Sequence, residues 1–309
     1  MRAAVILGLG CSARTLKSFQ DDETIKWRIG MPASAEEADI ILLFGGDGTV
    51  HRHLGQLVKL GLPVLIVAVG SGNDFARALG LGRVRDSLAA WRKFRQKATN
   101  VWLIDLGIVT ALSDARYVET GAPHAEAGAP RYFCCVAGIG LDSEVARRAN
   151  RLPRWLRAHG GYVLSLVPAI FRFAPFPMKI LMASGEVDHN GEVIWQSRSD
   201  QPTMLAAFAN SSTYGGGMKI APKAKMDDGL LDVCVVGGMD AFKLFCMFPT
   251  VYSGRHLSIS KVDYFQSDRL RVETEHPLEV YADGEYVCRT PIEVGVARGT
   301  LRVVIPRDC

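Results

Sequence analysis

The stretch LLFGGDGTVHRHL, residues 42–54, limits the folds open to this chain more than any other. An apolar run ends at two glycines, then an aspartate, a third glycine and a threonine follow, and the chain becomes polar and helix-like. Glycines here permit a tight turn, let backbone N–H groups approach a ligand, and place a helix N-terminus behind it. The stretch predicts a buried strand, an anion-binding turn and a helix, with an ordinary glycine-rich turn as the alternative.

Apolar strand patterns and helical patterns alternate from residue 3 to about residue 81. Residues 3–9, 39–44 and 62–70 have the composition of buried strands. Between the last two, apolar residues recur at the spacing of one helix face: Val50, Leu54, Leu57 and Val58. Continuous apolar strands that alternate with helices predict a parallel sheet covered on both faces, with ligands at the carboxyl ends of its strands. We therefore expect an α/β nucleotide-binding domain over residues 1–104.

The pattern changes after about Ile104, where short strands with turn residues between them take over. Repeated short strands predict a sandwich or barrel, so residues 105–309 are expected to form a mainly β sandwich domain. The predicted strands are MKILMAS, EVIWQSR, TMLAAFAN, LLDVCVV, RHLSISKV, RLRVETE, LEVYADG and TLRVVIP. Helical segments interrupt them at 142–173 and 240–252, and residues 112–130 have the composition of a polar surface loop.

Composition excludes several classes of protein. The net charge of +4 and the pI near 8.7 suit a phosphate-bearing ligand or an anionic membrane surface. The chain has no zinc-finger spacing and no dense basic tract, so no nucleic-acid partner is expected. The most apolar long window, 160–178, contains three prolines and an arginine, and it cannot supply a membrane-spanning helix.

The cysteines and the N-terminus point to the cytoplasm. Seven cysteines without a CxxC pair do not form a disulfide framework, and Cys134 and Cys135 are adjacent in an apolar run, as buried thiols in a reducing compartment would be. The N-terminal MRAAVILGLGC has the look of a truncated lipoprotein signal, but its apolar run is too short, so a first strand is expected. We expect a soluble or peripheral cytoplasmic protein.

A second glycine loop follows the next predicted strand. In VAVGSGNDFARALGL, residues 67–81, Gly70 and Gly72 flank Ser71, and an Asn-Asp pair precedes a helix, where either residue could serve only as a cap. The first loop has neither the lysine of a Walker A motif nor the G-x-G-x-x-G spacing. Asp47 would repel a bare phosphate, so its presence favours a Mg²⁺ ion that bridges phosphate oxygens.

These motifs together resemble the diacylglycerol kinase catalytic-domain family, which includes bacterial lipid kinases and the sphingosine and ceramide kinases. GGDGTVHRHL and GSGNDFARALG carry the resemblance in the first half. YFCCVAGIGLDSEVARRAN, YGGGMKIAPKAKMDDGLLDVCVV and YADGE carry it in the second, in the same order as in the family. The resemblance covers nearly the whole chain after about residue 38.

The resemblance implies a role for each matching position. The phosphates of ATP would lie against two loops that contain Gly45, Gly46, Asp47, Gly48 and Thr49, and Ser71, Asn73 and Asp74. Catalytic Mg²⁺ would be held by Asp47, Asp74 and Asp105. A structural Mg²⁺ loop would use Asp228 and the carbonyls of Lys225 and Leu230. Asp283 and Glu285 match the catalytic pair, with Glu285 as the acceptor of the lipid hydroxyl's proton, whereas from the residues alone Asp-Gly between strands favours a simple hairpin turn.

The chain also departs from the family pattern. Val69 and Ser71 stand where the family usually has proline and threonine, and His51 stands where it has asparagine. The family's Asn-Pro-x-Ser-Gly segment is replaced by GLGCSART, in which Ser12 and Arg14 are the nearest substitutes. These changes put the adenine and ribose contacts in doubt, and the nucleotide preference with them.

The expected function is an ATP- and Mg²⁺-dependent lipid kinase that phosphorylates a hydroxyl of diacylglycerol or a similar lipid. Two alternatives stay open. One is an NAD kinase-like enzyme, although the Asn-Glu pair expected of an NAD kinase is missing from the second loop of this chain. The other is a catalytically inactive lipid-binding or regulatory relative. Arginines at 147, 148, 151, 154 and 157 suit contact with an anionic membrane surface, and solvated arginines on an ordinary helix explain them equally well. His124, His189 and His256 receive no role, and the oligomeric state is open, a homodimer included.

Overall fold

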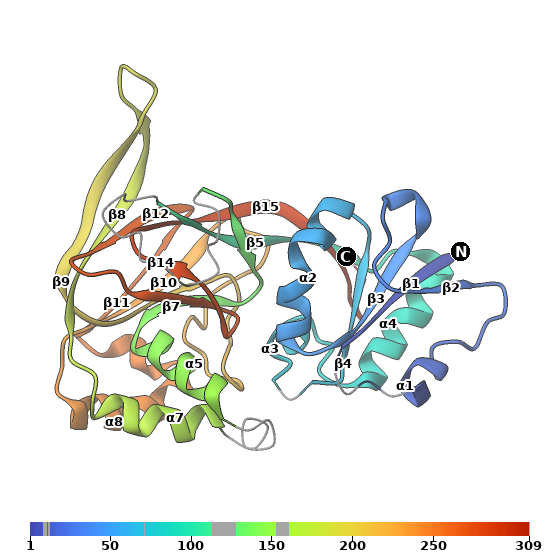
Figure 1. The fold of residues 1–309 in the computed structure, drawn as a ribbon, viewed down its shortest axis with the longest axis horizontal. Helices are drawn as coiled ribbons and strands as arrows, with labels where there is room; N and C mark the ends of the chain where they lie inside the picture. The colour runs from blue at the N-terminus through green and yellow to red at the C-terminus, as the bar shows by residue number, and fades with distance from the viewer. Residues whose placement is uncertain (9–10, 12, 71, 113–127, 153–160, 309) are drawn as a thin grey trace. The chain divides into compact units, whose positions relative to one another are not determined.

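The computed structural model describes residues 1–8, 11, 13–70, 72–112, 128–152 and 161–308 (Figure 1). Ser12, Ser71 and most of the predicted loop at 112–130 lie outside the described residues. The chain forms two compact units. Unit 1 contains Met1–Leu106 and Arg298–Cys309, and unit 2 contains Gly107–Ala297.

Unit 1 is built on a parallel sheet. Its strands, in spatial order, are β2 (Lys26–Ile29), β1 (Arg2–Leu7), β3 (Ile40–Gly45) and β4 (Val64–Ala68). The end of β15 (Ile292–Val304) adds a further parallel neighbour to β4, with Val303 opposite Val64. Every residue of β3 and β4 is buried, so both faces of the sheet are covered, as the unbroken apolar runs predict.

Short and long helices connect the strands of unit 1. They are α1 (Ala13–Lys17), the 3-10 helix η1 (Ala35–Glu37), α2 (Asp47–Leu60), α3 (Asp74–Ala78) and α4 (Val84–Lys97). Helix α2 buries Val50, Leu54 and Leu57 of the predicted stripe, and its fourth member, Val58, is half-buried. It ends at Gly61, whose left-handed backbone (φ 62°) lets its N–H bond the Leu57 carbonyl at 3.1 Å. On α4, the Trp91 indole donates to the Phe19 carbonyl at 3.1 Å.

Unit 2 is mainly β, and its strand pairs are antiparallel. The strands that lie wholly in unit 2 are β6 (Arg131–Phe133), β7 (Val136–Gly140), β8 (Phe176–Val187), β9 (Val193–Ala209), β10 (Leu231–Gly237), β11 (Val262–Ser267), β12 (Arg269–Thr274), β13 (Glu279–Ala282) and β14 (Glu285–Arg289). The end of β5 (Val101–Ala111) and the start of β15 also belong to this unit. The long β9 pairs its first part with β8 and its last part with β7 and β10. One apolar core joins strands from across the unit, including Phe133, Met178, Phe208, Val272 and Val294.

Helices cover one part of unit 2. They are α5 (Leu141–Arg151), α7 (Gly161–Ile170), α8 (Ala241–Val251) and the 3-10 helix η3 (Arg255–Ser258). Figure 1 shows α5, α7 and α8 gathered at one edge of the unit. The rings of Phe171, just after α7, and Phe245, on α8, lie 6.0 Å apart.

The predicted fold class is confirmed: a parallel α/β region comes first and a mainly β region follows. One predicted strand is wrong. Of the predicted strand 255–262, RHLSISKV, residues 255–261 form η3 and a turn, because His256 is fully buried and its Nε2 bonds the Ile220 carbonyl at 3.1 Å, and Val262 begins β11. The final residues, which the sequence boundary assigns to the second domain, lie in unit 1, since β15 runs on into the parallel sheet.

Candidate active site

The first glycine loop is shaped by contacts that leave no room for a side chain. Strand β3 ends at Gly45, and α2 begins two residues later at Asp47. A Cβ atom on Gly45 would lie 2.6 Å from the Thr49 Cβ, and one on Gly8 would lie 2.7 Å from the Thr49 Oγ1. The N–H groups in the first turn of an α-helix have no acceptor within the helix, so the start of α2 can bind an anion.

The second glycine loop packs directly on the first. A Cβ atom on Gly70 would lie 2.5 Å from the Gly46 Cα, so the two backbones touch. The Val69 N–H donates to the Gly45 carbonyl at 3.2 Å. Because β3 and β4 are parallel neighbours, both loops leave the sheet at the same edge, as predicted.

Asp47 joins the two loops. Its Oδ2 accepts the Asp74 N–H at 2.9 Å, and its Oδ1 accepts the Phe75 N–H at 3.1 Å. Gly72 passes so close that a Cβ there would lie 2.8 Å from the Asp47 Oδ2. The carboxylate therefore stabilises the first turn of α3, a structural role that the sequence alone does not reveal.

The Asn-Asp pair of the second loop is also held by the protein. Asn73 has a left-handed backbone (φ 56°), its Oδ1 accepts the Gly70 N–H at 3.2 Å, and its Nδ2 donates to the Gly70 carbonyl at 2.6 Å. Asparagine tolerates this conformation better than most residues. The Asp74 carboxylate is buried and accepts a hydrogen bond from the Arg77 guanidinium. Asn73 thus shapes the loop, and Asp74 carries an ion-paired carboxylate on a residue whose backbone N–H bonds Asp47.

Asp105 lies on β5 within unit 1. It is buried, and its Oδ1 accepts the Gly299 N–H of β15 at 2.6 Å. Among the residues that the structure describes, no three His, Cys, Asp or Glu side chains gather into a group that could hold a metal ion. Mg²⁺ commonly takes one or two carboxylates and completes its shell with water and substrate phosphates, so oxygen donors such as Asp47 and Asp74 fit this ion.

The predicted structural Mg²⁺ loop lies between β9 and β10. Asp228 is exposed, and its Oδ1 accepts the Leu230 N–H at 3.1 Å, closing a turn that passes through Gly229 (φ 73°). Lys225 is exposed and Leu230 is half-buried, in the same loop. Carbonyl and carboxylate oxygens are ligands that Mg²⁺ accepts, and the loop brings both kinds together in sequence.

The Asp283–Gly284 turn joins β13 to β14. The Asp283 Oδ1 accepts the N–H groups of Cys135 and Val136 at 2.8 and 3.3 Å, and its Oδ2 accepts the Cys134 N–H at 2.8 Å. These three bonds fix the turn, with Asp283 in a left-handed conformation (φ 51°). Glu285, the first residue of β14, is exposed beyond it. The structure thus gives the predicted pair different surroundings. Asp283 fixes the turn through its three hydrogen bonds, and the Glu285 side chain is exposed.

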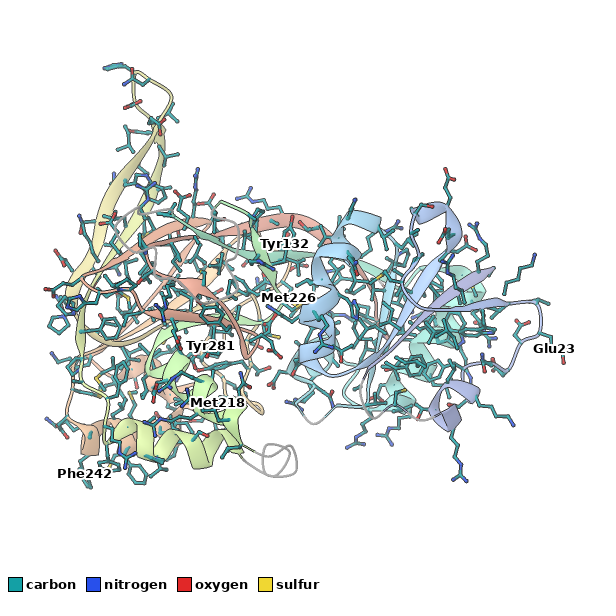
Figure 2. The ribbon with its side chains drawn as sticks, in the orientation of Figure 1. Glu23, Tyr132, Met218, Met226, Phe242 and Tyr281 are labelled. Carbon is teal, nitrogen blue, oxygen red and sulfur yellow. The ribbon has the colours of Figure 1, made fainter. Side chains whose placement is uncertain are left out.

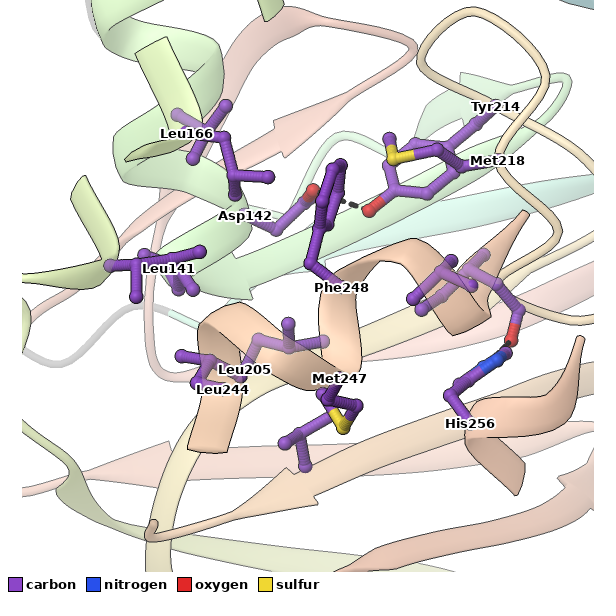
Figure 3. Close-up of a pocket in the computed structure, with 15 residues that line it drawn as sticks. Leu141, Asp142, Leu166, Leu205, Tyr214, Met218, Leu244, Met247, Phe248 and His256 are labelled. Carbon is purple, nitrogen blue, oxygen red and sulfur yellow. Dashed lines mark hydrogen bonds between the residues drawn. The ribbon is translucent and has the colours of Figure 1, made fainter. Parts of the chain in front are cut away.

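Unit 2 also contains an apolar pocket with a polar pair in it, which the sequence did not reveal (Figure 3). Its walls come from α5, α7, α8 and the strands beside them, and include Leu141, Val145, Leu166, Ile170, Leu244 and Met247. Inside it, the Tyr214 hydroxyl donates to the Asp142 Oδ1 at 2.7 Å. Both residues belong to segments that carry the family resemblance, and Asp142, just after a glycine-rich strand, was the available signal.

His256 lines the same pocket and is fully buried. Burial lowers the pKa of its imidazole, so the ring is neutral in the folded protein at neutral pH. Its Nε2 bonds the Ile220 carbonyl, and no described protein atom bonds its Nδ1. The arginines of α5 that the sequence singled out are partly paired: Arg147 and Arg148 both bond Glu144. Arg154 and Arg157 lie outside the described residues.

No described helix is long and apolar enough to cross a bilayer.

Comparison with known proteins finds two family models along the chain. Residues 20–106 match the diacylglycerol kinase catalytic domain, and residues 135–305 match the YegS C-terminal NAD kinase beta sandwich-like domain. A diacylglycerol kinase of Mycobacterium tuberculosis (strain ATCC 25618 / H37Rv) is 31% identical over 277 residues, which are 89% of this chain and 79% of that protein. A diacylglycerol kinase of Bacillus subtilis is 24% identical, over 89% of this chain and 80% of that protein.

Among solved structures, the chain is similar to that of a diacylglycerol kinase from Bacillus anthracis str. Sterne. The TM-score is 0.65 and the sequence identity is 21%, over 98% of this chain and 96% of that chain. This similarity supports the fold of the chain, in which a parallel α/β region comes first in the sequence and a mainly β region follows.

Proposed function

The chain belongs to the diacylglycerol kinase family of lipid kinases, and on that basis we propose that it transfers the γ-phosphate of ATP to a hydroxyl of diacylglycerol or a related lipid. The observation that carries this proposal is the pair of touching glycine loops at the ends of β3 and β4, joined by the Asp47 carboxylate. Bare backbone at Gly46 and Gly70 lets phosphate oxygens approach main-chain N–H groups at the start of α2.

The acidic residues of unit 1 fit a role in holding Mg²⁺. In this proposal Asp47 and Asp74 would hold the ion, with waters and substrate phosphates completing its shell, because the described residues do not bring Asp105 together with them into a group of three. Asp228 with the carbonyls of Lys225 and Leu230 would form a second, structural site. Mg²⁺ supplies charge neutralisation on the transferring phosphoryl group. Asp47 already orients the second loop through two N–H bonds, so it can fix the loop and face the ion with the same carboxylate.

Glu285 is the proposed general base. Its carboxylate accepts the proton of the lipid hydroxyl as that oxygen forms a bond to the γ-phosphorus and the bond to the β-phosphate oxygen of ATP breaks, which leaves ADP. Asp283 acts on Glu285 indirectly, as a positioning residue, because its three N–H bonds fix the turn from which β14 starts.

The pocket of unit 2 supports a lipid acceptor. Its walls are aliphatic and aromatic, and the Asp142–Tyr214 pair can hydrogen-bond a hydroxyl or ester of an amphiphile. Its interior volume is about 40 Å³, which is room for roughly three water molecules. An acyl chain must therefore displace the side chains that line the pocket.

Phosphate transfer from γ-labelled ATP into a lipid panel tests this proposal. Diacylglycerol, monoacylglycerol, sphingosine, ceramide and phosphatidylglycerol are presented in mixed micelles with Mg²⁺, and NAD is included as a water-soluble acceptor. We expect label in one lipid, and loss of that label in Asp47→Ala and Glu285→Gln. Glu186→Gln, an exposed glutamate on β8, is the matched control and should keep full activity.

Three results would contradict the proposal. Label in NAD alone would identify an NAD kinase, and full activity in Asp47→Ala would remove the assigned phosphate site. Bound ATP without transfer to any lipid would make the protein an inactive relative, and the altered N-terminal segment around Arg14 would then be the first place to examine.

A further inference from the structure

Helix α8 is apolar on every side, yet only one side of it is covered. Its sequence, AFKLFCMFPTV, contains a single charged residue. Leu244, Met247 and Val251 face inward, where they are buried against the pocket. On the outer side, Phe242 is 68% exposed and Phe245 is 41% exposed. A helix that is apolar all round normally has apolar surroundings on all sides, whereas the residues that the structure describes cover the outer side of α8 only in part.

Neighbouring residues extend this exposed surface into a patch. Phe171 is 57% exposed and Val167 is 38% exposed, on or just after α7, and Phe171 contacts Phe245 through its ring. Tyr252, just after α8, is 41% exposed. We call these five residues the aromatic patch. Its three phenylalanines expose on the order of 300 Å² of surface, which is the size of the largest apolar patch on many monomeric proteins, a patch that often has a function. Figure 2 shows Phe242 at the outer edge of unit 2.

The charged residues around the aromatic patch are mainly basic. Arg172 follows Phe171, Lys243 follows Phe242, and Arg255 begins η3 just after α8, all three exposed. The sequence has no aspartate or glutamate from residue 145 to 185 or from 241 to 262. Asp240, which caps α8 and lies 3.3 Å from the Lys243 Nζ, is the acidic residue nearest in sequence. Protein surfaces carry both signs of charge, whereas the surface of an anionic bilayer is uniformly negative.

We propose that the aromatic patch docks on the surface of an anionic phospholipid bilayer. The phenylalanine rings and Tyr252 enter the interfacial region, and Arg172, Lys243 and Arg255 pair with lipid phosphates. The same two helices present their inner sides to the apolar pocket, so docking brings that pocket next to the acyl chains of the membrane. This inference rests on the proposed lipid kinase function for its purpose, but its test does not depend on turnover.

Vesicle binding is the direct test. The full chain is sedimented with vesicles of phosphatidylcholine alone and of phosphatidylcholine mixed with phosphatidylglycerol. We expect the unchanged protein to bind the mixed vesicles. The variant Phe242→Ser/Phe245→Ser should bind them with an affinity at least roughly tenfold lower, because its apolar insertion is lost. Arg172→Gln/Lys243→Gln should weaken binding to the mixed vesicles by about fivefold per residue, and added salt should reduce the difference.

Two matched variants distinguish binding through the aromatic patch from non-specific binding through other exposed apolar residues. Ile29 on β2 is 71% exposed and Val187 on β8 is 61% exposed, so Ile29→Ser and Val187→Ser remove comparable apolar groups elsewhere. Both should bind vesicles as the unchanged protein does. Equal binding by Phe242→Ser/Phe245→Ser, with an unchanged melting temperature, would overturn the proposal, as would a lack of binding by the unchanged protein.

A fluorophore on α8 gives a second readout. Cys246 is the exposed thiol among the described cysteines, and it lies on the outer side of α8 next to Phe245. With Cys11 and Cys309 replaced by serine, a polarity-sensitive dye on Cys246 should shift to shorter wavelength when mixed vesicles are added. The same dye on Val187→Cys, in a chain that also carries Cys246→Ser, should not shift.

Activity measurements distinguish failure of this inference from failure of the proposed function. The patch variants should phosphorylate a short-chain, monomerically dispersed diacylglycerol as the unchanged protein does, and lose activity only on vesicle-embedded substrate. Vesicle binding without any phosphate transfer would support the docking surface and count against the kinase assignment alone. Equal loss on both substrates would contradict a docking role.

Discussion

Single residues in this protein combine a structural task with a proposed chemical one. Asp47 is the clearest case, because its carboxylate bonds two N–H groups of α3 while it lies at the start of α2. Gly72 approaches that carboxylate so closely that no side chain fits between them. A substitution at Asp47 therefore affects folding as well as catalysis, which the sequence alone did not anticipate.

Asp47→Ala should abolish transfer and also lower stability. Two backbone N–H groups lose their acceptor, which costs about 1–3 kcal/mol in the free energy of unfolding. Asp47→Asn retains an oxygen for one N–H and should lose less stability, yet it should be equally inactive because the charge is gone. Melting curves and labelled-ATP assays on both variants check this. An active Asp47→Asn would show that the carboxylate charge is not required.

His256 predicts a pH dependence of stability. Burial lowers the pKa of its imidazole from the ordinary value of about 6.5, so the unfolded chain takes up a proton at a higher pH than the folded protein does. Stability is therefore unaffected above about pH 7 and falls as the pH drops below about 6.5. His256→Gln, which can still donate to the Ile220 carbonyl, should lose less stability than the unchanged protein between pH 7 and pH 5. An equal fall in melting temperature for both would rule out this residue as a cause.

At the level of elements, the two glycine loops behave as one part. The contact between Gly46 and Gly70 joins the end of β3 to the end of β4. Gly70→Ala would place a methyl group 2.5 Å from the Gly46 Cα, so we expect a displaced loop and a large loss of ATP affinity. Gly55→Ala is the control, because Gly55 lies inside α2 with no atom within 4 Å of the added Cβ. It should raise stability by about 0.5–1 kcal/mol. Nucleotide binding by calorimetry and melting temperature measure the two effects.

The β13–β14 turn depends on Asp283 in the same way. Asp283→Ala leaves three N–H groups without their acceptor, so we expect a loss of about 3 kcal/mol in stability. Because the turn then no longer fixes Glu285, kcat should fall while KM for ATP stays close to its original value. Asp283→Asn retains an acceptor oxygen and should recover part of both losses. A fall in stability without any change in kcat would limit Asp283 to a purely structural role.

The sequence predicted elements best where local pattern and tertiary environment agree. The apolar runs of β3 and β4 and the stripe of α2 appear in the structure close to where they were expected. The strand predicted at residues 255–262 is not formed as expected, because η3 occupies its first residues. An alternating pattern cannot reveal that His256 bonds the Ile220 carbonyl from a 3-10 helix. The N–H partners of Asp47 and Asp283, and the pairing of Asp142 with Tyr214, are long-range contacts that no local spacing encodes.

At the level of the whole molecule, the two units differ in continuity. Unit 2 is a single stretch, Gly107–Ala297, with its own apolar core. Unit 1 needs Arg298–Cys309 in addition to its first 106 residues, because the end of β15 pairs with β4 and the Asn100 side chain donates to the Ile305 carbonyl at 2.7 Å.

This difference predicts how fragments behave. A fragment of residues 107–297 should unfold cooperatively in denaturant, because it contains every residue of its apolar core. A fragment of residues 1–106 should not, since β4 loses a neighbour and Asn100 loses a buried bond. Addition of residues 298–309 through a short glycine-serine linker should restore a cooperative transition in the second fragment. Cooperative unfolding of residues 1–106 alone would contradict this.

The split composition of unit 1 also sets the order in which the units can form during synthesis. A ribosome synthesises the chain from its N-terminus, so the first strands of the parallel sheet emerge before the end of β15, which pairs with β4. The residues after Arg298, which complete that sheet, are made only after all of unit 2 has been translated. Unit 2 is therefore the first to have all its residues outside the ribosome, and the unit that begins the chain is the last one finished.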